Sequence, residues 1–250
     1  MAPQYGPHRW SAGYHDDGTN QALRGTTFLV KDLAGARFVD CDLTGVKVVD
    51  GCLVDVDVSG YVERLVVNGV DVTDHVNAHD EWYPLRTVLL VTTAEQMRRG
   101  VTLLDEAWAT TLDRALALPE AQLYESVDGE WSFAQTLRHL VFAVDKWFDV
   151  PILGGSFHAF GMPNTGSRDF PWPGLDLDAD PPLDEVLAAR TAQAERLRTY
   201  LADLTDEDVG RTVEVLENGT HQVHECIGTV FEESFWHLRY ARRDLDRLSG

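Results

Sequence analysis

The feature that most constrains the fold is a change in hydrophobic period along the chain. From Thr93 onward, apolar residues recur with the 3.6-residue period of an amphipathic α-helix. Four stretches have this period, over residues 93–118, 132–150, 183–204 and 223–248. Long helices that each carry one apolar face bury those faces against one another. The sequence therefore predicts a mainly α fold built on a four-helix bundle.

The predicted helices carry start and stop signals. Thr93 and Ser132 each precede a glutamine by three residues, which is the capping-box pattern. Pro151 predicts the end of the second helix, because proline has no backbone N–H to donate. The connection over residues 154–182 is rich in proline and glycine and too long for a tight antiparallel turn. We expect it to cross the bundle and cover a site.

Residues 26–60 have a period of five instead. The apolar positions that follow this period are Phe28, Leu33, Phe38, Leu43, Val48, Leu53 and Val58. Neither a helix nor a flat strand has this period. The segment resembles pentapeptide-repeat proteins, which form a square right-handed β-helix, and the blocks KDLAG (31–35) and CDLTG (41–45) match best. Seven five-residue units form fewer than two coils, which is too few to bury a core. We therefore expect the segment to pack against another domain.

These patterns divide the chain into three parts. Residues 1–25 are polar without an apolar period and predict an irregular N-terminal arm. Residues 26–85 contain the short β-helix-like segment, and residues 86–250 contain the bundle.

Two Asn-Gly dipeptides predict β-hairpins, because both residues tolerate the left-handed backbone of a type I′ turn. Asn68-Gly69 lies between β-branched runs and predicts a hairpin over residues 61–72 that closes the end of the β-helix. Asn218-Gly219 predicts a second hairpin over residues 212–222, between the third and fourth helices.

Composition narrows the class of partner. The chain has 41 acidic and 21 basic residues, and its net charge of -20 opposes binding to nucleic acid and to anionic membranes. It has neither a leader-like N-terminus nor a long apolar run, so we expect a cytoplasmic protein. The three cysteines lack C-x-x-C spacing, which argues against a disulfide framework and a cysteine zinc site.

Glu233 and His237 are four residues apart on the last predicted helix, where their side chains share one face. Together with a ligand from a neighbouring helix, such as His139, they could hold a divalent metal with open positions. Both residues lie at the edge of the buried stripe, a position that also suits a simple Glu–His ion pair. Periodicity alone favours this ion pair over a metal site. His139 lies off the centre of its own stripe, so periodicity does not place it opposite Glu233.

His75 and His79 form a second pair four residues apart, flanked by two aspartates. They lie in a short polar junction in which a stable helix is doubtful. We therefore regard them as a weaker metal site than the pair on the last helix.

Two blocks resemble a known family, DGEWSFAQTLRHLVFAVDKW (128–147) and EESFWHLRYARRDLDRL (232–248). They are similar to the signature helices of the DinB superfamily, metal-binding four-helix bundles that include mycothiol- and bacillithiol-dependent transferases. Many members bind zinc or another divalent ion through one histidine on the second helix and an H-x-x-x-H on the last. The resemblance implies that His139 and His237 are ligands and that Glu233 replaces the first histidine of the pair. Zinc is the expected metal, with Ni, Fe or Mn as alternatives.

The resemblance implies an enzyme that activates a mycothiol-like thiol for transfer to, or isomerisation of, a small electrophilic substrate. His158, in the long loop, and Tyr240, beside His237, are the candidate catalytic residues. An ordinary loop histidine and a tyrosine that caps the core are the alternatives. The resemblance also implies a possible homodimer. Two other functions stay open: a non-enzymatic metal-binding or stress-response protein that contacts a partner through its β segment, and a metal-dependent hydrolase.

Overall fold

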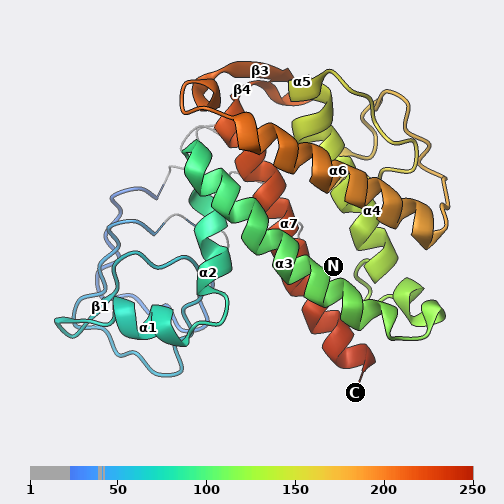
Figure 1. The fold of residues 1–250 in the computed structure, drawn as a ribbon. Coiled ribbons are helices and arrows are strands. Elements are labelled where there is room, and N and C mark those ends of the chain that lie inside the picture. Colours follow the sequence, from blue (N-terminus) through green and yellow to red (C-terminus); the bar gives the residue numbers. More distant parts are fainter. Residues whose placement is uncertain (1–22, 39–40, 42, 250) are drawn as a thin grey trace. The chain divides into compact units, whose positions relative to one another are not determined.

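The computed structural model describes residues 23–249 except 39, 40 and 42, and it is mainly helical, as the sequence predicts (Figure 1). The chain divides after Val58 into two compact units. The larger unit contains four long helices. They are α3 (Ala94–Leu116), α4 (Phe133–Val144), α6 (Leu183–Asp203) and α7 (Val223–Leu248).

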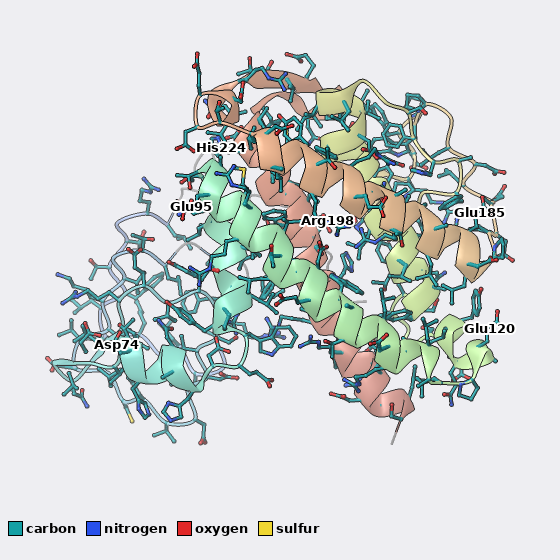
Figure 2. The ribbon with its side chains drawn as sticks, in the orientation of Figure 1. Asp74, Glu95, Glu120, Glu185, Arg198 and His224 are labelled. Carbon is teal, nitrogen blue, oxygen red and sulfur yellow. The ribbon has the colours of Figure 1, made fainter. Side chains whose placement is uncertain are left out.

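The four long helices enclose one core. Helix α3 packs against α6 and α7, and α4 packs against the same two helices, so the contacts close a ring (Figure 1). Polar contacts join neighbours within the ring. Arg198 of α6, which is labelled in Figure 2, is one such residue. Its guanidinium donates to Asp105 Oδ2 of α3 at 2.6 Å. Buried Trp108 of α3 donates its indole N–H to Ser234 Oγ of α7 at 2.8 Å. Interhelical hydrogen bonds of this kind determine which faces of the helices pack together.

Both predicted capping boxes form. The hydroxyl of Thr93 accepts from the Gln96 backbone N–H, and the Gln96 side chain accepts in return from the Thr93 backbone. The hydroxyl of Ser132 and the side chain of Gln135 do the same at the start of α4. These caps satisfy backbone donors that a helix start leaves without a partner.

The second helix does not end at Pro151. After α4 the chain makes a π-helical turn over Asp145–Asp149 and continues as α5 (Val150–Leu153). Proline is tolerated here because it lies in the first turn of α5, directly after the π-helical turn. Gly154, with a left-handed φ of 69°, ends the helix.

Both predicted hairpins form. Strand β1 (Val66–Val67) pairs antiparallel with β2 (Val70–Asp71), and both Asn68 and Gly69 have the positive φ of a type I′ turn. Strand β3 (Thr212–Val215) pairs with β4 (Gly219–Gln222) across a short 3-10 turn at Leu216–Asn218.

The remaining elements of the described residues are short. They are α1 (Thr73–His79), α2 (Tyr83–Arg86), and 3-10 turns at Thr87–Leu90, Glu120–Tyr124, Thr165–Ser167 and Asp208–Gly210. Among the helices of residues 23–249, apart from the gaps given above, none combines the length and the hydrophobicity needed to cross a membrane.

The predicted right-handed β-helix is not confirmed. No strand forms in the described residues of 23–58, which run as turns and irregular chain. The row of apolar residues stays exposed, from 46% at Leu43 to 68% at Val48. The physical reason is the small number of repeats, because a solenoid of fewer than about three coils has too few neighbouring coils to cover its apolar row. Residues 1–22 of the predicted N-terminal arm lie outside the described residues.

Candidate metal centre

The three predicted ligands meet in space. His139 of α4 and Glu233 and His237 of α7 each offer one ligand atom, and these atoms all lie within 4.8 Å of one another. His139 Nε2 is 3.2 Å from Glu233 Oε2, and His237 Nε2 is 3.3 Å from the same oxygen. The contact between α4 and α7 thus brings together residues that periodicity left apart.

The cluster is buried. His139 is 1% exposed, His237 5% and Glu233 8%. Desolvation opposes the charge on Glu233, but hydrogen bonds and charge interactions with both histidines outweigh it and hold the pKa of Glu233 well below its ordinary value. Glu233 is therefore an ionised carboxylate between two imidazoles.

The long connection over residues 154–182, called the crossing loop below, determines which nitrogen of His139 carries the proton. His139 Nδ1 lies 2.9 Å from the backbone oxygen of Met162, and a carbonyl oxygen can only accept, so Nδ1 is the donor. In neutral His139 the lone pair of Nε2 then faces the ionised oxygen of Glu233. Two acceptors at this distance repel unless a proton or a cation lies between them. A backbone carbonyl on the outer nitrogen is also the usual support of a metal-binding histidine.

Aromatic rings form the walls of the cluster. The Trp131 ring is 4.7 Å from the His139 ring and stacks on His237 at 5.9 Å with an angle of 17° between the planes. Tyr240 also contacts His237, in an edge-to-face arrangement with the ring centres 5.9 Å apart. The structure therefore places the predicted residue Tyr240 beside the cluster. Trp131 was not predicted, although it stands directly before the cap of α4 in the family-like block.

His158 lies elsewhere. Its backbone N–H donates to Asp145 Oδ2 at 2.7 Å, and its Nδ1 donates to Asp145 Oδ1 at 2.9 Å. Asp145 is fully buried and also accepts from Gln193 of α6 at 2.8 Å. The hydrogen bond to Asp145 raises the pKa of His158, while burial raises the pKa of Asp145. His158 thus ties the crossing loop to the π-helical turn that follows α4 and is not a member of the ligand cluster.

The other histidine pair does not form a comparable group. The polar junction does fold as helix α1, contrary to our expectation, and the rings of His75 and His79 are 4.4 Å apart. However, within the described part of the chain, the only metal-competent group of three is the one formed by His139, Glu233 and His237.

The protein is a helical bundle with two imidazoles and one carboxylate at the contact of α4 and α7, a donor set that could hold a divalent metal ion. The profile of the DinB superfamily matches residues 103–241, a range that includes all three ligand candidates. The chain belongs to the DinB superfamily. Comparisons with curated proteins and with solved structures gave no significant match.

Proposed function

We propose that the chain is a divalent-metal-dependent enzyme of the DinB type, which activates a low-molecular-weight thiol resembling mycothiol for reaction with a small electrophilic substrate. The observation that carries the proposal is the pair of acceptors at the contact of α4 and α7. His139 Nε2 and Glu233 Oε2 lie 3.2 Å apart, and both are acceptors in neutral His139 because the Met162 carbonyl oxygen holds the proton on Nδ1. A divalent cation would turn this repulsion into attraction.

The donor set fits such an ion. Two imidazoles and one carboxylate suit Zn²⁺ and also Fe, Ni or Mn, and three protein ligands leave positions for a small molecule. A bound ion would supply positive charge that lowers the pKa of a coordinated thiol. Because the pKa of Glu233 is low, the carboxylate is ionised at neutral pH, and this is the form that binds a cation.

The surrounding residues would orient the reactants. Trp131 lies across both imidazoles and would exclude water from that side of the centre. Tyr240 is the proposed hydrogen-bond donor to substrate. A catalytic role for His158 is also retained as a proposal, but Asp145 engages its Nδ1, so only its Nε2 could reach a substrate.

The test is turnover. Metal-loaded protein is incubated with a panel of electrophiles, with and without mycothiol, alongside His237→Ala and the control His79→Ala, which alters an exposed histidine of α1. We expect thiol-dependent turnover that His237→Ala abolishes and His79→Ala preserves. Turnover without thiol would instead indicate a hydrolase that uses metal-bound water. Bound metal without any turnover would favour the non-enzymatic alternative.

We also propose that residues 26–60 form a repeat-like contact surface for a second copy of the chain. Positive-φ turns support the repeat, because they recur at every fifth position that is described, at Gly25, Val30, Gly35, Gly45, Asp50, Asp55 and Gly60. Val48 belongs to the exposed apolar row, whereas the equally exposed Val46 does not. In the full chain, Val48→Asp is expected to weaken a dimer measured by analytical ultracentrifugation, and Val46→Asp is the matched control. A monomeric wild-type chain would contradict this proposal.

A further inference from the structure

Lys146 is a buried ammonium in the helical turn that follows α4, the helix of the ligand His139. The two residues are seven positions apart, close to two helical turns, and only the last two of these positions lie in the π-helical turn, so their side chains lie toward one face. Lys146 is only 8% exposed. It lies in the π-helical turn Asp145–Asp149, and such turns often mark functional positions in helices.

Lys146 has a carboxylate partner and two aromatic neighbours. Its Nζ is 2.6 Å from Glu217 Oε1, in the turn between β3 and β4, and it lies 4.9 Å from the centre of the Trp172 ring and 5.2 Å from that of Trp147. Burial lowers the pKa of Lys146, whereas Glu217 and the metal-centre residue Glu233 raise it. Glu233 of the ligand cluster is therefore one of the charges that favour the protonated ammonium.

Aromatic contacts connect Lys146 to the cluster. The Phe142 ring is 6.1 Å from the His139 ring and 4.8 Å from the Trp172 ring, above which the ammonium lies. Between His139 and Lys146 on the helix face stands Ala143, which contributes only a methyl group. A series of ring contacts thus runs from the ligand His139 through Phe142 and Trp172 to the ammonium of Lys146.

Stability alone is a weak explanation for this lysine. A buried ion pair seldom stabilises a fold more than well-packed apolar residues of the same size. The hairpin that carries Glu217 already has its own antiparallel ladder from Thr212 to Gln222. The side chain of Glu217 is 28% exposed, so its carboxylate can exchange with solvent more easily than the 10% exposed ammonium can.

We propose that Lys146 binds a carboxylate of the substrate held at the metal centre. In the absence of substrate, Glu217 forms an ion pair with the Lys146 ammonium in its place. The substrate class is then a small electrophile that bears a carboxylate some distance from its reacting carbon. This proposal rests on the proposed metal centre, since the metal-bound thiol would hold the reacting end.

The experiment uses the full chain loaded with Co²⁺, whose thiolate charge-transfer band reports binding. The probes are ω-mercaptocarboxylates from mercaptoacetate to 6-mercaptohexanoate, each compared with the neutral mercaptoalkanol of the same length. The seven-residue separation corresponds to about 10 Å along the helix axis, so the longer acids are expected to bind best. A charge-assisted hydrogen bond in a buried site predicts a preference for the acid of about tenfold or more.

Substitutions at Lys146 and at Glu217 should shift the preference in opposite directions. Lys146→Met should abolish the preference for the acid and leave alkanol binding unchanged, whereas Lys146→Arg should preserve it. Glu217→Gln should strengthen binding of the acid, because the internal competitor is lost. Thermal unfolding of each variant checks that the fold is intact. A preference that none of these changes moves would overturn the proposal and leave Lys146 as a structural ion pair.

Failure of the metal centre gives a different result. If even the alkanols leave the Co²⁺ spectrum unchanged, the proposed function fails. The ammonium is then tested in the metal-free chain by the increase in Tm that glutarate or adipate produces. Wild type should be stabilised more than Lys146→Met, and equal responses would overturn the assignment of Lys146.

Discussion

Replacement of Glu233 by glutamine tests the electrostatics of the cluster without changing its shape. In the metal-free chain, a proton must take the place of the cation between the Glu233 carboxylate and each imidazole, at 3.2 Å from His139 Nε2 and at 3.3 Å from His237 Nε2. Hydrogen bonds to a charged group contribute about 1.5–3 kcal/mol, and neutral ones about 0.5–1.5 kcal/mol. Two such contacts that become neutral therefore lower the free energy of unfolding by about 2 kcal/mol.

Thermal denaturation of metal-free protein at neutral pH measures this loss. For a unit of this size, about 2 kcal/mol corresponds to a decrease in Tm of about 4–8 °C. Glu106→Gln, on the exposed face of α3, is the matched control and should change stability by less than about 0.5 kcal/mol.

The same loss should depend on pH. Because the pKa of Glu233 is lower in the folded than in the unfolded chain, its stabilisation is present above the ordinary carboxyl pKa and disappears as pH falls through the lowered value. The difference between wild type and Glu233→Gln should therefore shrink in acid. A glutamine variant as stable as wild type at neutral pH would refute the inference that an ionised carboxylate is held between the two imidazoles.

Three further predictions follow from the structure. Glu233→His restores the usual family ligand and should retain or tighten zinc binding in a competition titration, and loss of zinc would count against the assigned geometry. His158→Gln should increase amide hydrogen exchange in the crossing loop at acidic pH more than at alkaline pH. The pKa of His158 is raised by Asp145, so the bond stabilises the fold below the ordinary histidine pKa and is lost as pH rises through the raised one. Gly100→Ala would place a methyl group 2.8 Å from the Phe231 ring, so chemical denaturation should show a loss of about 1–3 kcal/mol, and unchanged stability would refute the close contact of α3 with α7.

The helices were predictable from the sequence because their signals are local. The caps at Thr93 and Ser132 and the 3.6-residue period depend on residues within a few positions of one another. The end of the second helix was not predictable in this way. Pro151 reads as a terminator, but the π-helical turn before it starts a new helical segment in which proline is tolerated.

The ligand set was only partly predictable. The spacing of Glu233 and His237 gives their common face, but the position of His139 opposite them depends on how α4 and α7 cross, which no local pattern records. The family resemblance supplied that link. Lys146 was missed for a similar reason, because the Trp172 ring that covers it comes from the crossing loop, far along the chain.

The β segment shows the limit of a repeat pattern. The five-residue period correctly indicates regular turns, since a turn residue with positive φ recurs with the same period from Gly25 to Gly60 in the described residues. It does not ensure a β-helix, because burial of the apolar row requires neighbouring coils that so short a segment lacks.

Elemental analysis of protein purified without a metal-affinity tag tests the central claim most directly. We expect about one divalent ion per chain, because the described residues contain one buried His/Glu/His set. The His139→Ala and His237→Ala variants should each lose that ion. His79→Ala should retain the ion, because that exposed histidine lies outside the cluster. Protein that contains no divalent metal, or that keeps its metal when His139 and His237 are both replaced, would contradict the account.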